Sequence, residues 1–205
     1  MANTKYVFDM GDIGEDTITY QWHQFIDDEM VSSITDLMQH ISKDTPIIGF
    51  SKDISKSAIF RYIDDLNEKL MANRNRLVTF NSERFGIIGL CTLVLNSNPN
   101  NRHIADLAKG MINPSHRGSG VLAGAFYEIC IQCKKDNVDL VTLDVRANSA
   151  AQIIWQRFGF AIYGTLPDYA RQNGQSFSGH FMHTPVSELK STSIKHLKAN
   201  ECAIS

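Results

Sequence analysis

The chain has 205 residues, a hydrophobic content of 43% and a formal net charge of -2 at pH 7. This length suffices to bury one good hydrophobic core, and the small net charge argues against a nucleic-acid or membrane partner held by bulk electrostatics. No apolar run approaches the roughly 20 residues that span a bilayer, and the acidic first residues do not resemble a signal peptide. We therefore expect a soluble, cytoplasmic protein that binds neither nucleic acid nor membrane.

The first half of the chain predicts two helices among several strands. Residues 1–16 are polar, and we expect them to be loosely held. Patterns of apolar residues then indicate, in order, a strand over 17–25, a helix that begins at Asp27 and ends before Pro46, a loop over 47–55, a helix over 55–72, and strands over 76–80, 85–95 and 103–112. Ser55 is the expected N-cap of the second helix.

The stretch over 111–145 carries the most information. An apolar strand ends before Pro114, and Arg117 and the turn Gly118-Ser119-Gly120 then lead into a helix with apolar residues at three-or-four spacing. A buried strand over 138–145 follows. A helix N-terminus preceded by glycines offers unpaired backbone N–H groups to a phosphate. A tight turn that needs positive φ would also account for the glycines, so both interpretations stay open at this point.

The last part of the chain alternates between regular and irregular segments. The sequence indicates a helix over 148–157, a strand that begins at 158–160, a loop over 164–176 rich in Gly, Pro and Asn, a strand over 177–184 and a polar tail over 187–205. One βαβ unit among antiparallel strands predicts a single α/β or α+β domain over 17–186.

Neither a disulfide framework nor a metal site is expected. Four cysteines do not form a disulfide framework in a chain of this size. Cys130 and Cys133 spell C-x-x-C inside the predicted helix, but no second pair completes a zinc site. We expect these cysteines to pack in the core. The spacing of the histidines does not indicate a metal either.

A dinucleotide site is the first alternative for the glycines, since Gly118 to Ala123 matches G-x-G-x-x-[GA] and Asp144 lies downstream. In a dinucleotide-binding domain, however, the glycines follow their strand directly, whereas residues 113–117 intervene here. The chain after the motif is also too short for the further βα units of such a domain. A P-loop is excluded because the stretch lacks G-K-[ST].

The run Ser115-His116-Arg117-Gly118-Ser119-Gly120 resembles the acyl-CoA-binding motif [QR]-x-x-G-x-[GA] of the GNAT superfamily of N-acyltransferases, with Ser in place of the first Gln or Arg. The block LDVRANSAAQIIWQRFGF, which begins at Leu143, resembles the superfamily's segment in which Asn opens a helix and an aromatic-x-x-x-Gly-Phe ends it. The resemblance covers about residues 17–186. It implies a mixed, mostly antiparallel central sheet with a splayed parallel strand pair and flanking helices.

Within that superfamily, four short motifs resemble those of the tabtoxin resistance proteins. The motifs are D-x-x-K-x-M from Asp106, P-S-x-R-G-x-G from Pro114, L-D at Leu143, and G-x-L-P-x-Y from Gly164. This resemblance implies an acetyl-CoA-dependent N-acetyltransferase that acts on a small polar amine, such as an amino acid, a toxin or an antibiotic-like compound. Protein N-termini and lysines stay open as acceptors.

The resemblance also implies where the ligands bind. The pantetheine arm would lie between the strands that end near Ile112 and Asp144, with the pyrophosphate on the N–H groups of residues 117–121. The implied cofactor-binding residues are Met111, Ile112, Asn113, His116, Arg117, Gly118, Ser119, Gly120, Val121, Asn148 and Trp155. The candidate catalytic bases are Asp106 and Asp144, and the candidate substrate-binding residue is Tyr169. Each of these four polar side chains also has a plain structural alternative: a salt bridge for Asp106, a loop contact for Asp144, a helix N-cap for Asn148 and packing for Tyr169.

Trp155 departs from the superfamily's pattern, because many members carry a Tyr there whose hydroxyl protonates the leaving thiolate. Indole donates only a neutral N–H. Water or Tyr163 could supply the proton, or the thiolate could leave unaided. The alternative is a non-catalytic acyl-CoA sensor or interaction module. A homodimer is left open.

Overall fold

The computed structural model describes residues 4–44, 54–200 and 203–204, so most of the loop expected over 47–55 lies outside the described residues. The elements in chain order are β1 (Lys5–Asp9), η1 (Gly11–Ile13), β2 (Glu15–His23), α1 (Asp28–Asp44), α2 (Lys56–Met71), β3 (Asn75–Ser82), β4 (Gly86–Leu95), η2 (Pro99–Asn101), β5 (Ile104–Ile112), η3 (Pro114–His116), α3 (Val121–Lys135), β6 (Leu140–Arg146), α4 (Ala150–Arg157), β7 (Ala161–Gln172), β8 (Gln175–Pro185), α5 (Val186–Ala199) and β9 (Ala203–Ile204).

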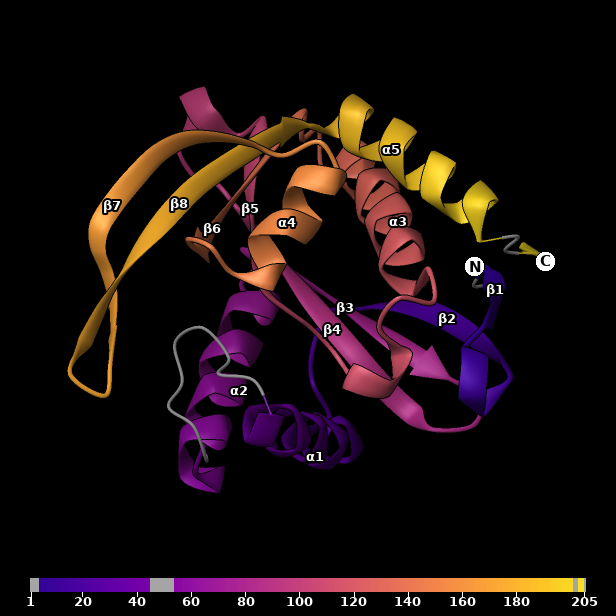
Figure 1. Cartoon of the computed structure of the whole chain (residues 1–205). Helices are drawn as coiled ribbons and strands as arrows, with labels where there is room; N and C mark the ends of the chain where they lie inside the picture. The colour runs from indigo at the N-terminus through magenta and orange to yellow at the C-terminus, as the bar shows by residue number, and fades with distance from the viewer. Residues whose placement is uncertain (1–3, 45–53, 201–202, 205) are drawn as a thin grey trace.

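One sheet organises the molecule. Its strands follow the order β7-β8-β6-β5-β4-β3-β2-β1-β9. Neighbouring strands pair antiparallel except β5 and β6, which are parallel. Helices α1 and α2 cover one face, and α3 and α5 cover the other (Figure 1). The expected mixed, mostly antiparallel sheet with flanking helices is confirmed.

The central strands are buried on both faces. Successive residues of a strand point to opposite sides of the sheet. Leu77 of β3 therefore packs into the apolar cluster under α1 and α2, while Val78 packs into the cluster under α3. The same alternation separates Leu90 from Cys91 on β4. Two-sided burial explains why these strands appear in the sequence as nearly continuous apolar runs.

Helices α1 to α4 form close to their expected bounds. The Ser55 hydroxyl accepts a hydrogen bond from the Ala58 N–H at 3.2 Å, which confirms Ser55 as the N-cap of α2. Cys130 and Cys133 are buried on the core side of α3, which confirms their packing role. None of the helices in the described ranges combines the length and hydropathy needed to cross a membrane.

The packed fold extends past both expected ends of the domain. The expectation of a loose N-terminal segment is wrong for β1, which pairs with β2 and buries Tyr6 and Phe8. The expectation of a polar C-terminal tail is wrong for α5, which buries Leu189, Ser193 and Leu197 at a spacing of four residues. Two or three buried side chains suffice to dock each segment. Neither segment therefore has enough apolar residues to show a clear pattern in the sequence.

The loop expected over 164–176 is also wrong. Strand β7 continues to Gln172, and the chain turns at Asn173 and Gly174, whose φ values are 51° and 76°. Strands β7 and β8 form a long curved hairpin, residues 161–185, which we call the arm; its base pairs with β6, and its distal part extends from the body of the domain (Figure 1). Most of β7 is exposed, so its strand conformation comes from pairing with β8 and leaves no apolar alternation in the sequence.

Candidate active site

The parallel strands β5 and β6 pair over only part of their length. Ile104, Ala105 and Asp106 pair with 140–142 of β6. Beyond Asp106 the two strands are not paired with each other, although β5 continues to Ile112 and β6 to Arg146. The expected divergence of this strand pair is confirmed, and it leaves backbone groups along both strands to be satisfied by other partners.

A β-bulge reshapes β5 within the divergent part. Leu90 pairs with Met111 and Thr92 pairs with Ala108, so two residues of β5 lie opposite one residue of β4. Lys109 adopts a φ of 52° at this bulge. The extra residue shifts the side-chain alternation of the strand by one position.

The backbone after the bulge presents one amide toward β6. The Asn113 N–H donates to the Ile88 carbonyl at 2.7 Å, and therefore points toward β4. Because successive amides of a strand point in opposite directions, the Ile112 N–H points away from β4, into the space between the divergent strands. An amide in this position can donate to a ligand that lies between them.

The glycine turn, residues 118–120, is built from backbone. Gly118 and Gly120 have φ values of 83° and 95°, which only glycine adopts readily. The amides of residues 118–122 donate no hydrogen bond to any described residue. These amides lie just before α3 and in its first turn, and a helix N-terminus with free amides binds anions. The Arg117 N–H, which the sequence predicts to contribute as well, donates instead to the Pro114 carbonyl at 3.2 Å.

His116 does not join this anion site. Its side chain is 1% exposed, and its Nε2 lies 3.7 Å from the Asp16 carboxylate. Its Nδ1 is hydrogen-bonded to the Ser115 hydroxyl at 2.9 Å. Burial lowers the pKa of His116, and the nearby Asp16 carboxylate opposes this shift. The expectation of a cofactor contact is therefore wrong for this side chain, which supports the turn from inside the protein.

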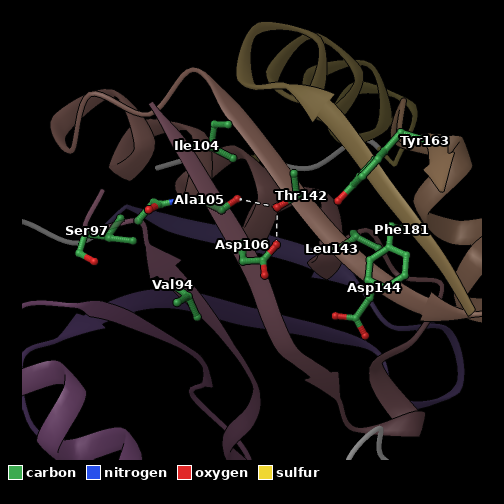
Figure 2. A pocket seen from close by; sticks show the side chains of 12 residues that line it. Val94, Ser97, Ile104, Ala105, Asp106, Thr142, Leu143, Asp144, Tyr163 and Phe181 are labelled. Atoms are coloured by element: carbon green, nitrogen blue, oxygen red, sulfur yellow. Dashed lines mark hydrogen bonds between the residues drawn. The ribbon is translucent and has the colours of Figure 1, made fainter. Parts of the chain in front are cut away.

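A cavity of about 470 Å³ lies where β5 and β6 begin to diverge. We call it the acceptor cavity; its walls include Asp106, Thr142, Asp144, Tyr163 and Phe181 (Figure 2). Both candidate bases thus face one cavity. The Thr142 hydroxyl donates to the Asp106 carboxylate. Thr142 was missed in the sequence, although it lies two residues before Asp144 and strand alternation places both on one face.

Tyr169 reaches Asp144 from the arm. Its phenol donates a hydrogen bond to the Asp144 carboxylate. Burial raises the pKa of the Tyr169 phenol, and the hydrogen bond to Asp144 raises it further. Burial lowers the pKa of Lys109, while the negative charge of Asp144 opposes that shift. Asp144 therefore has a phenol and a nearby cation as neighbours.

Two further expected residues lie beyond the divergent strands. Asn148 is exposed with a φ of 57°, but the N-cap of α4 is Ser149, whose hydroxyl accepts from Gln152 N–H. The structural alternative for Asn148 is therefore wrong. Trp155 packs against Phe126, with ring centroids 5.3 Å apart. Its indole also lies over the bulge, 3.8 Å from where a Cβ on Gly110 would stand.

No protein-family model matches the chain. Solved structures do match it. RimJ from Mycobacterium smegmatis, in complex with CoA-disulfide, is 13% identical with a TM-score of 0.70, covering 96% of this chain and 94% of that one. Spermidine N-acetyltransferase from Vibrio cholerae, in complex with CoA and spermine, is 18% identical with a TM-score of 0.65, covering 83% and 97%. An acetyltransferase of the GNAT family from Streptococcus pneumoniae is 15% identical with a TM-score of 0.64, covering 81% and 99%.

These matches show the fold. The chain has the GNAT fold. A dinucleotide-binding domain would need a mostly parallel sheet, and this sheet contains a single parallel pair among its described strands. The dinucleotide alternative is therefore ruled out by the topology.

Proposed function

We propose that the protein is an acetyl-CoA-dependent N-acetyltransferase that modifies a primary amine of a small polar molecule, such as an amino acid, a toxin or an antibiotic-like compound. One observation carries this proposal: the divergent pair β5 and β6 has a row of free amides at one end and a carboxylate-lined cavity at the other. The free amides fit a phosphate-bearing acyl donor, and the carboxylate-lined cavity fits a cationic acceptor.

In this proposal acetyl-CoA spans the divergent strands. Its pyrophosphate accepts from the amides of residues 118–122, and its amide-rich pantetheine arm pairs with the open backbone edges of β5 and β6. Trp155 lies over Gly110 of the β5 bulge, and Asn148 follows the end of β6. RimJ and the spermidine N-acetyltransferase, which share the fold, were solved with CoA-disulfide and with CoA, and this supports the choice of donor.

The acceptor amine binds as an ammonium and must lose a proton before it attacks. Asp106 is the better base of the two candidates, since its described partner is the neutral hydroxyl of Thr142. Asp144 already interacts with the Tyr169 phenol and with the charge of Lys109. We therefore assign proton abstraction to Asp106.

The bond changes then follow in one ternary complex. The amine nitrogen attacks the thioester carbonyl carbon, and the Ile112 N–H donates to the oxyanion that develops. The C–S bond breaks, the acetyl group stays on the nitrogen, which releases its excess proton to solvent to become a neutral amide, and CoA leaves as a thiolate. Trp155 cannot protonate this thiolate, but a thiol with a pKa of roughly 8.5 is a tolerable leaving group without help.

Trp155 also favours a second candidate, a protein that binds acyl-CoA without turning it over. A thiol-release assay with acetyl-CoA and a panel of small amines, paired with calorimetry of acetyl-CoA binding, separates the two. Amine-dependent release of CoA supports the enzyme and eliminates the sensor. Tight binding without turnover on any amine supports the sensor, and absence of both binding and turnover would overturn both candidates.

A further inference from the structure

The arm sends one aromatic side chain back into the site. Leu166 of β7 pairs with Gly179 of β8, but the next pair along the two strands joins Ala170 to Phe177. Three residues of β7 thus lie opposite one residue of β8, and Tyr169 is one of them. The Ser178 hydroxyl donates to the Pro167 carbonyl at 3.1 Å and holds this bulge. The bulge therefore has its own cross-strand support.

The Tyr169 ring has a seat that only glycine provides. A Cβ on Gly179 would overlap the ring, so the ring lies directly on the β8 backbone. Phe181 contacts the ring edge-on, with centroids 6.3 Å apart. From this seat the phenol donates to Asp144. Because burial and Asp144 both raise the pKa of Tyr169, the phenol keeps its proton at neutral pH and acts as a fixed donor.

We propose that Tyr169 is a positioning residue, which holds the Asp144 carboxylate in place on the wall of the acceptor cavity so that Asp144 binds the cationic acceptor. The sequence alone suggested a direct substrate contact for Tyr169. In the structure its hydroxyl is already committed to Asp144, and it acts on the acceptor through that carboxylate. This inference rests on the proposed function, and it makes the arm a determinant of acceptor affinity.

The test compares Tyr169→Phe with the wild type in steady-state kinetics. The variant keeps the ring on Gly179 and removes only the donor. We expect the KM for the amine to rise about tenfold, as for one lost hydrogen bond to a charged group, while kcat and the KM for acetyl-CoA change less than threefold. Tyr127→Phe, which removes a phenol from α3, is the matched control and should behave as the wild type.

A double-mutant cycle asks whether Tyr169 acts through Asp144. In an Asp144→Asn background, Tyr169→Phe should change the amine KM less than twofold, because the partner it positions is gone. Additive effects of the two changes, or a Tyr169→Phe effect confined to kcat, would overturn the proposal.

A spectroscopic measurement keeps this inference separate from the activity itself. With tyrosine labelled with ¹³C at Cζ, the Tyr169 resonance is assigned by its loss in Tyr169→Phe, and its titration is followed without ligands. Asp144→Asn should lower the pKa of Tyr169 if the pair exists in solution. An unchanged titration contradicts the pair, whereas a shifted titration in a protein that lacks turnover contradicts only the proposed function.

Discussion

The two ends of the divergent strand pair are built from different parts of the polypeptide. At the end proposed for the cofactor, the available groups are backbone amides, freed by Gly118 and Gly120 at positive φ. At the acceptor end they are side chains, with carboxylates from β5 and β6 and aromatic rings from the arm. The cofactor end therefore depends on backbone conformation, while the acceptor end depends on which side chains neighbouring strands supply.

Under the proposed function, this difference predicts where specificity resides. Backbone amides recognise phosphate in the same way whatever residues surround them. The cofactor end can therefore bind acetyl-CoA whichever amine the protein modifies. The acceptor cavity takes Tyr163 and Phe181 from the arm, and Tyr169 reaches Asp144 from it. Changes in the arm should therefore alter the choice of amine and leave acetyl-CoA binding alone.

The largest expected effect comes from the acceptor end. Asp106→Asn should lower kcat by roughly 100- to 10,000-fold, the usual contribution of a general base, with acetyl-CoA affinity unchanged in calorimetry. Asp12→Asn, at an exposed carboxylate in η1, is the control and should keep full turnover. If Asp106→Asn retained wild-type kcat, the base would have to be a different group.

At the cofactor end we expect a smaller effect, on the affinity for acetyl-CoA and not on kcat. The double change Gly118→Ala with Gly120→Ala places Cβ atoms at φ values of 83° and 95°, which costs about 1–3 kcal/mol each. Acetyl-CoA affinity should fall tenfold or more if the turn shifts to relieve this strain. The fold should survive, because Val121, Phe126 and Ile129 anchor α3 in the core.

The hairpin turn of the arm offers a matched control for these glycines. Gly174 has a φ of 76° and open space around it, so Gly174→Ala introduces similar strain far from the proposed pyrophosphate. It should leave acetyl-CoA affinity intact in the same calorimetric titration. If Gly174→Ala and the double variant lost the same acetyl-CoA affinity, the loss would come from backbone strain anywhere in the protein and not from the glycine turn.

The same contrast explains what the sequence predicts and what it does not. Glycines at fixed spacing, an apolar strand before them and an amphipathic helix after them are local signals, and the turn formed as expected. The approach of Tyr169 to Asp144 is not local, since it depends on a bulge in a mostly exposed strand expected to be a loop. The expectation that the His116 side chain contacts the cofactor is wrong for a related reason: its partner, Asp16, lies in a segment expected to be loose.

The smallest expected effect tests whether buried side chains also support the cofactor end. His116 lies beneath the glycine turn beside Asp16, and burial lowers its pKa from the ordinary 6.5. Below about pH 6.5 the unfolded chain therefore binds a proton that the folded protein resists, so the free energy of unfolding should decline as the solution is acidified.

His116→Gln removes the titrating group and should flatten this decline. Thermal unfolding at several values between pH 7.5 and 5.5 gives the slope of Tm against pH, which should be shallower in the variant than in the wild type. His40→Gln, at an exposed histidine of α1, should keep the wild-type slope. If acetyl-CoA affinity falls as the pH is lowered in the wild type but not in His116→Gln, protonation of His116 beside Asp16 changes the phosphate binding of the glycine-turn amides. If the slopes agree in all three proteins, His116 supports the turn by packing alone, and the cofactor end is set by backbone conformation without an ionisable support.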